Sequence, residues 1–157
     1  MKPRFSFVIP DTSCLILLTK IGEIEILNRL FDNVIVSTHV NIEFGEMLPP
    51  WVSIKSPRNH HYQELLMLEI DKGEASAIAL HFETDNSILV LDDLKARKLG
   101  DKLKIDFTGT FGIILRAKKV GIIKSVKPIL DKIKNTNFRF SEKIFDIVLK
   151  QAGEENE

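Results

Sequence analysis

The stretch FSFVIPDTSCLILLTK, residues 5–20, places one carboxylate, Asp11, between two apolar segments of different period. Residues 5–9 are short, apolar and rich in β-forming side chains, which predicts a buried strand. Residues 13–31 have apolar side chains at helical spacing, with a break predicted at Gly22. Asp11 could simply be the N-cap of that helix. Whether Asp11 has a functional role beyond capping therefore depends on whether other carboxylates occupy equivalent positions.

The composition is that of an ordinary globular protein, with 157 residues, 44% hydrophobic and 28% charged. This length suits one domain, which we expect over residues 1–153, followed by an acidic tail at 154–157. No apolar run approaches the roughly 20 residues that span a bilayer, and no secretion signal is recognisable. The single cysteine, Cys14, excludes an internal disulfide and a cysteine-based zinc site. We expect a cytoplasmic protein without membrane contact.

The formal net charge of zero hides an uneven distribution of charge along the chain. Residues 1–115 contain 12 Lys and Arg against 16 Asp and Glu, whereas residues 116–150 contain 10 Lys and Arg against 3 Asp and Glu. An acidic body beside a basic C-terminal third could separate metal binding from polyanion binding. Solvated helix faces explain the same counts.

Strands and helices are predicted to alternate along the chain. Strands are expected at 5–9, 33–37, 51–56, 86–91 and 104–107, and helices at 13–31, 38–48, 59–70, 71–85, 92–103, 108–121, 125–135 and 141–153. The helix at 38–48 is expected to start at a Thr cap and to end at Pro49 and Pro50. One apolar face of the helix at 71–85 is expected to carry Ala75, Ile78, Ala79 and Phe82. Such alternation predicts an α/β fold with a parallel sheet covered on both faces.

Carboxylates recur where these strands end. Asp11 follows the first strand, Asp92 and Asp93 follow the strand at 86–91, Glu43 lies on the helix after the second strand, and Glu74 opens the helix at 71–85. Functional groups of parallel sheets gather beyond the carboxyl ends of the strands. Each like-charge pair at about 4 Å costs on the order of 4 kcal/mol near a protein surface, so the cluster predicts a bound cation or raised pKa values. Oxygen ligands favour Mg²⁺ or Mn²⁺.

Each acid also has a structural interpretation, as a helix cap, a dipole partner or a solvated side chain. Two other classes with acidic edges fit less well. A phosphotransfer receiver would need paired acids after the first strand and a Lys after the last strand. A haloacid-type phosphatase would need Asp-x-Asp, and here the second position is Ser13.

Several motifs resemble the PIN-domain nucleases, in particular the branch of predicted nucleic-acid-binding toxins of toxin–antitoxin pairs. They occur in the family's order and cover nearly the whole chain: DTSCLILLTKIGEIEIL, VNIEF, DKGEASAIAL, LVLDDLKARKLGDKLKIDFTGTFGIILRAKKVGII and FRFSEKIFDIVLKQAGE. The resemblance implies a three-layer α/β/α sandwich with a parallel sheet of about five strands. It also implies that Asp11, Glu43, Glu74 and Asp92 or Asp93 hold the metal, with Ser13 as a polar neighbour of Asp11.

The function predicted from these observations is a Mg²⁺- or Mn²⁺-dependent endoribonuclease, the toxin of a two-gene module. Thr108 and Thr110 would hold a water or a ligand carboxylate, and Arg116, Lys118 and Lys119 would form the approach for RNA. The implied partners are a small antitoxin protein and a second copy in a homodimer. Leu17, Ile21, Ile24 and Leu27 are candidates for exposed contact positions, with core packing expected for about half. The alternative is a catalytically silent RNA- or protein-binding module of the same fold.

Overall fold

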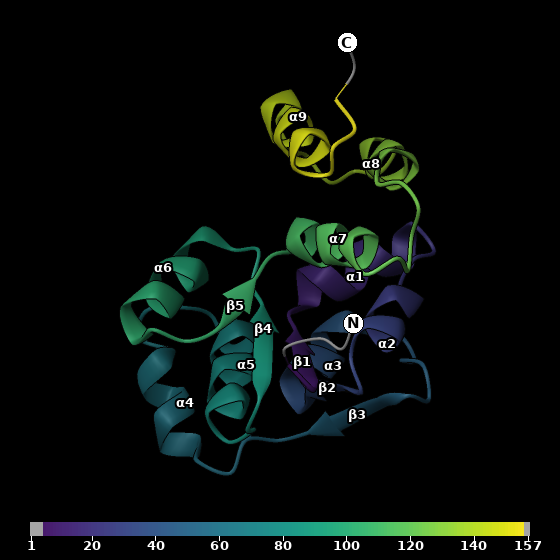
Figure 1. Ribbon diagram of the computed structural model, residues 1–157. Helices are drawn as coiled ribbons and strands as arrows, with labels where there is room; N and C mark the ends of the chain where they lie inside the picture. The colour runs from purple at the N-terminus through teal and green to yellow at the C-terminus, as the bar shows by residue number, and fades with distance from the viewer. Residues whose placement is uncertain (1–4, 156–157) are drawn as a thin grey trace.

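The computed structural model describes residues 5–155, and these form a five-stranded, entirely parallel sheet between layers of helices (Figure 1). The strand order in the sheet is β3-β2-β1-β4-β5. The α/β class, the three layers and the parallel sheet of five strands are therefore confirmed. The strands are β1 (Phe7–Pro10), β2 (Asn33–Ser37), β3 (Val52–Lys55), β4 (Ser87–Val90) and β5 (Phe107–Thr108).

The central position of β1 places its C-terminal end beside that of β4. The two strands pair in parallel from Phe7 with Ser87 to Pro10 with Val90. Side chains alternate between the two faces, so that Val8 and Val90 belong to one core while Ile9 and Leu89 belong to the other. Because the strands are buried on both faces, they read as continuous apolar runs in the sequence.

One face of the sheet is covered by helices that come early and late in the chain. These are α1 (Thr12–Lys20), α2 (Glu25–Leu30) and α7 (Thr110–Lys119), and their apolar side chains share a core with Val8 and Val90. The opposite face is covered by α4 (His60–Leu66), α5 (Lys72–Phe82) and α6 (Leu94–Leu103). Helix α3 (Thr38–Phe44) contacts both α1 and α5, so it bridges the two faces.

The C-terminal helices α8 (Lys127–Lys134) and α9 (Glu142–Gln151) form a further layer outside α7 (Figure 1). Edge-to-face ring contacts join Phe111 of α7 to Phe140 and to Phe145 of α9. Glu154, which the sequence analysis assigns to an acidic tail, accepts hydrogen bonds from the backbone N–H groups of Val126 and Lys127. Residues 1–4 of the expected domain and 156–157 of the expected tail lie outside the described residues.

Three local expectations were wrong. Helix α3 is capped by the Ser37 hydroxyl, which accepts from the Val40 N–H, and it ends at Phe44, before Gly45. Gly45 has a φ of 73°, a left-handed conformation that commonly ends a helix ahead of any proline. Phe82 is 50% exposed rather than buried, because it lies in the last turn of α5 and its ring packs on Tyr62.

Core packing was expected for about half of the candidate contact positions on the first helices, and the expectation that the others are exposed was wrong. Leu17, Ile21 and Leu27 are all buried, and Ile24 packs against the same core. The reason is that apolar side chains of α7 and α8 pack into the same core as these helices, which a helical apolar pattern alone does not reveal. No helix within residues 5–155 has the length and apolar character that a membrane span requires.

Candidate functional site

The carboxyl edge of the sheet brings Asp11 and Asp92 into direct contact. Asp11 follows β1 immediately and Asp92 lies two residues after β4, and these two strands are neighbours. The backbone N–H of Asp92 donates to Asp11 Oδ2 at 3.0 Å. The two acids that the sequence analysis assigned to the same edge therefore meet there.

Asp11 is both a helix cap and a buried acid. Its Oδ1 accepts from the Cys14 N–H at 2.8 Å at the start of α1, and the residue is only 4% exposed. Burial, and then the charge of Asp92, raise the pKa of Asp11 from 3.8 to about 7, although backbone hydrogen bonds oppose the shift. Asp11 therefore is the N-cap of α1. Capping alone, however, does not require that the residue be buried beside a second carboxylate.

Asp92 is fixed by the first residue of α7. The Thr110 N–H donates to Asp92 Oδ1 at 2.8 Å, and the Thr110 hydroxyl donates to Oδ2. Thr110 is only 2% exposed, so it is placed to hold the Asp92 carboxylate and not to contact a large substrate. A carboxylate has about four lone-pair sites, and these bonds leave Asp92 with acceptor capacity for a cation.

Glu74 and Asp93 form the other side of the acidic edge. Glu74 lies in the first turn of α5, next to Asp71, which caps that helix by accepting from the Glu74 N–H. Partial burial, then a side-chain hydrogen bond with Asp71 and the charges of Asp71 and Asp93, raise the pKa of Glu74 from 4.5 to about 8. Asp93 caps α6 by accepting from the Ala96 N–H. Each of the two adjacent acids after β4 therefore faces a different partner.

Glu43 connects the two sides through α3. Its Oε1 accepts from the Thr12 hydroxyl at 2.8 Å, next to Asp11 in the chain. The same oxygen lies 2.2 Å from where a Cβ on Gly73 would be, so the absence of a side chain at Gly73 lets Glu43 approach α5. His39 lies one turn earlier on α3, with Nε2 at 3.8 Å from Glu43 Oε2.

These acids form a series along one edge of the sheet. Hydrogen bonds join Asp92 to Asp11 and Thr12 to Glu43, Glu43 approaches the Gly73–Glu74 turn, and Glu74 and Asp93 line the same surface hollow. All the metal-site candidates of the sequence analysis belong to this series, which we call the acidic edge: Asp11, Glu43, Asp71, Glu74, Asp92 and Asp93. Burial is the main cause of the raised pKa values of Asp11 and Glu74, and the charges of neighbouring acids raise both values further.

The donors of the acidic edge fit a hard divalent cation. They are carboxylate oxygens, whereas the nearby Cys14 thiol is buried, and burial followed by the charges of Asp11 and Asp92 raises its pKa well above the ordinary value. Within residues 5–155 no three Asp, Glu, His or Cys side chains are close enough to enclose an ion by themselves.

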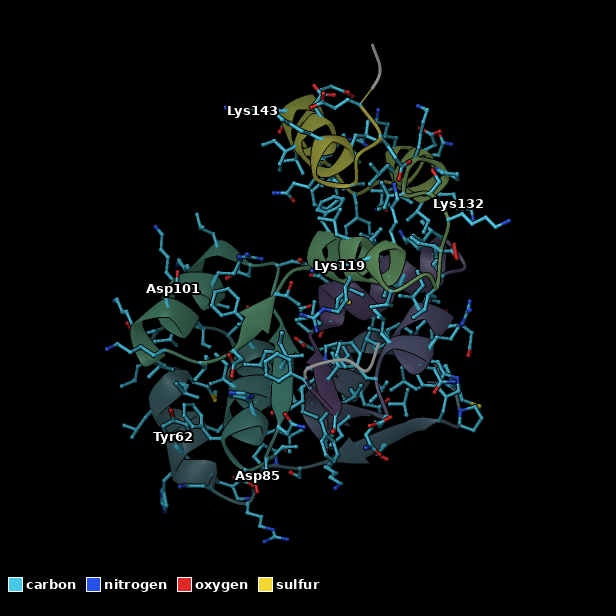
Figure 2. All side chains as sticks on the ribbon, viewed as in Figure 1. Tyr62, Asp85, Asp101, Lys119, Lys132 and Lys143 are labelled. Carbon is cyan, nitrogen blue, oxygen red and sulfur yellow. The ribbon has the colours of Figure 1, made fainter. Side chains whose placement is uncertain are left out.

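The remaining predicted residues lie at different distances from this edge. Ser13 is exposed on the first turn of α1, and Thr108 lies at the end of β5 with its Oγ1 against Gly112. Arg116, Lys118 and Lys119 occupy the last turn of α7, roughly 10 Å along the helix from Thr110 at 1.5 Å per residue. Figure 2 labels Lys119 on α7, Lys132 on α8 and Lys143 on α9, so the basic third belongs to the outer helical layers.

Lys118 has a partner inside the protein. Its Nζ donates to Glu154 Oε2 at 2.7 Å and to the backbone oxygen of Ala152. The same Glu154 carboxylate accepts a hydrogen bond from the Val126 N–H, immediately before α8. Lys118 therefore joins the C-terminal segment to α7, and Arg116 and Lys119 do not share this contact.

Sequence reasoning missed Thr12, Asp71 and Arg97 as members or neighbours of the site. Asp71 had a usable signal, because an N-cap residue followed three positions later by Glu is a capping-box pattern. Thr12 contacts Glu43 across 31 positions of sequence, and Arg97 donates to the Leu91 oxygen at 2.9 Å beside Asp92. The last two contacts depend on tertiary packing and have no local signature.

The fold is a parallel α/β sheet with carboxylates gathered at its carboxyl edge, the edge at which sheets of this class bind their ligands. The model of a family described as PIN domain matches residues 7–154, so the chain belongs to the PIN-domain family. PIN domains are typically nucleases, and they generally use divalent metals. A search of curated proteins found no match.

Proposed function

We propose that this protein is a Mg²⁺- or Mn²⁺-dependent endoribonuclease whose active site is the acidic edge. The observation that supports this most is the contact between the buried Asp11 and Asp92, with Glu74 and Asp93 on the other side of the same edge. A fold keeps such mutually repelling groups at a cost in stability, and a bound cation would remove that cost.

In this proposal Asp11 and Asp92 hold a cation, and Glu74, Asp93 and Glu43 contribute through direct or water-mediated contacts. A bound Mg²⁺ or Mn²⁺ supplies a water of lowered pKa and stabilises charge on the phosphate. The protein's own contribution is to fix the ligands. Cys14 N–H and Asp92 N–H orient Asp11, while Thr110 orients Asp92, so neither carboxylate has to reorganise when a substrate arrives.

The test is RNA cleavage by the purified protein. We expect single-stranded RNA to be cut internally with Mn²⁺ or Mg²⁺ and to remain intact with a chelator. Calcium, which is larger and coordinates less rigidly, is a useful comparison ion. Absence of cleavage with every ion, in a preparation that still binds Mn²⁺, would favour the silent RNA- or protein-binding module instead.

We further propose that the protein is the toxin of a two-gene module, that it binds a small antitoxin protein and that it forms a homodimer. The resemblance to the toxin branch supports this. So do the exposed apolar side chains beside Asp93, since Leu68 is 82% and Leu94 66% exposed. Exposed apolar groups next to an active site are suitable anchors for an inhibitory partner.

Expression of the wild-type chain alone should therefore slow the growth of a bacterial host, and Asp11→Ala should restore growth. Both proteins must accumulate in folded form for the comparison, which a western blot and a thermal melt of the purified proteins would check. Normal growth with abundant folded wild-type protein would contradict the toxin role without affecting the cleavage assay.

A further inference from the structure

A hollow of about 260 Å³ opens beside Asp92, between the start of α7 and α9. Asp92, Arg97 and Gly109 line its polar side, and Phe111, Ile144 and Ile147 line its apolar side. The proposed mechanism does not use this space, yet one of its walls is a proposed metal ligand. A ligand in the hollow would therefore lie next to the reacting phosphate.

The polar side presents a cation without a carboxylate partner. Arg97 donates one N–H to the Leu91 oxygen at 2.9 Å, and its guanidinium lies over the Phe107 ring at 5.2 Å. An arginine has five N–H donors, and no ion pair in the described part of the chain involves Arg97. The remaining donors are suited to a phosphate oxygen, which arginine binds in a planar, bidentate fashion.

Gly109 keeps Arg97 close to Asp92. A Cβ at this position would lie 2.7 Å from Arg97 Nη1 and 3.0 Å from Asp92 Oδ1. Any other residue would have to displace the guanidinium or the carboxylate. The glycine thus leaves room for both the Arg97 guanidinium and the Asp92 carboxylate beside it.

The apolar side contains side chains that the core does not need. On α9, Phe145 and Val148 are buried, whereas Ile144 is 37% and Ile147 45% exposed. Phe111 also lines this side; it is partly buried, and its ring packs edge-to-face on Phe145 of α9. An apolar wall with an aromatic ring and a nearby cation is the arrangement that binds the bases and backbone of single-stranded nucleic acid.

We infer that the hollow binds one nucleotide of the RNA strand next to the scissile phosphate, with its base on Phe111, Ile144 and Ile147 and its phosphate at Arg97. This inference rests on the proposed ribonuclease function and assigns a substrate contact to α9. An RNA strand explains the hollow better than a protein partner, because the apolar wall is continuous with an unpaired arginine and a metal ligand. The proposed site also provides the positive charge of Arg97 beside the acidic edge. The basic residues in the last turn of α7 lie too far along that helix to do so.

The experiment measures binding of a short fluorescein-labelled single-stranded RNA by anisotropy, over a range of salt concentrations and in the presence of chelator. All proteins carry Asp11→Asn, so that residual cleavage cannot interfere. Ile147→Ser should weaken binding about tenfold with an unchanged salt slope. Arg97→Gln should weaken binding and also reduce the slope of log K against log salt by about 0.7, the value for one lost phosphate contact on a single strand.

Two controls make the same substitutions, Ile to Ser and Arg to Gln, at positions away from the hollow. Ile54→Ser changes an exposed side chain on β3, at the opposite edge of the sheet from β5, and Arg58→Gln changes an arginine whose backbone N–H is bonded to Glu83 beyond the end of α5. Neither should alter RNA affinity or salt slope by more than the error of the measurement. Arg97→Lys, which keeps the charge, should restore the slope, and this separates a phosphate contact from a loss of folding.

Equal affinities and slopes for the hollow variants and their controls would overturn the inference, even if the wild-type protein cleaves RNA. The same holds if Ile147→Ser weakens binding of an inhibitory protein but not of RNA. The proposed ribonuclease function fails by a different result, namely no cleavage by the wild-type protein with Mn²⁺ or Mg²⁺. The two failures are therefore distinguishable.

Discussion

Replacing Asp11 with Asn is expected to lower Mn²⁺-dependent RNA cleavage by more than about 100-fold, the upper range for loss of a group that merely supports a metal ligand. Asn removes the charge and leaves a single side-chain oxygen, so the contacts with Cys14 N–H and Asp92 N–H cannot both be kept along with a cation. Single-turnover cleavage rates of the two proteins at saturating Mn²⁺ would measure the effect.

The same substitution should change how the metal-free protein responds to pH. Because the folded-state pKa of Asp11 is raised from 3.8 to about 7, the native state binds more protons than the unfolded state between these values. The free energy of unfolding of the wild type should therefore fall as the pH rises from about 4 to about 7. Asp11→Asn should flatten this dependence, and added Mn²⁺ should stabilise only the wild type strongly.

Asp101→Asn is the matched control, since Asp101 is an exposed acid on α6 (Figure 2). It should cleave RNA, respond to Mn²⁺ and respond to pH like the wild type. Equal thermal shifts with Mn²⁺ in Asp11→Asn and the wild type would mean that the ion binds elsewhere. Cleavage by Asp11→Asn within a few-fold of the wild-type rate would contradict the proposed role of the acidic edge.

The sequence was sufficient to predict the sheet and the meeting of Asp11 with Asp92. Both follow from local patterns, namely short apolar runs that end in an acid, and from the rule that parallel strands share one carboxyl edge. The position of Glu43 was predictable only approximately. Its contact with Thr12 depends on how α3 crosses between α1 and α5, and no local pattern encodes that crossing.

The outer helical layer explains most of what the sequence did not reveal. Leu17 and Leu27 looked available to a partner because a helix pattern identifies an apolar face without identifying what covers it. The cover here is partly α8, more than 100 residues later in the chain. Lys118 was likewise expected in an RNA approach and Glu154 in an acidic tail, although the two side chains pair across 36 positions.

That pair leads to the second large effect, on stability. Replacing Glu154 with Gln is expected to lower the free energy of unfolding by about 2 kcal/mol, in the range measured for hydrogen bonds to charged groups. The carboxylate accepts from Lys118 Nζ at 2.7 Å, from the Ser125 hydroxyl and from the backbone N–H groups of Val126 and Lys127. Gln keeps one acceptor oxygen and loses the charge, so at least one of these donors would lose its partner.

The effect should depend on pH in a direction opposite to that of Asp11. Burial alone would raise the pKa of Glu154, but the hydrogen bonds from Lys118, Ser125, Val126 and Lys127 outweigh it and lower the pKa from 4.5 to about 2. The stabilisation is therefore present above pH 4.5 and is lost as the pH falls through about 2. Urea unfolding of both proteins at pH 7 and at pH 3 should show a smaller difference at the lower pH.

Glu155→Gln separates this specific contact from a general loss of negative charge. Glu155 is the neighbouring residue, and its Oε1 lies 4.0 Å from Lys150 Nζ with both side chains more than half exposed, so its replacement should change stability by less than about 0.5 kcal/mol. Because Glu154 attaches the start of α8 to the end of α9, its loss should loosen the outer layer first, including the wall of the hollow that carries Ile147. Asp11 and Asp92 lie just beyond the ends of the central strands β1 and β4, so the thermal shift with Mn²⁺ should survive in Glu154→Gln. A variant that lost this response as well would show that the acidic edge depends on the outer helices, which the contacts around Asp11 do not predict.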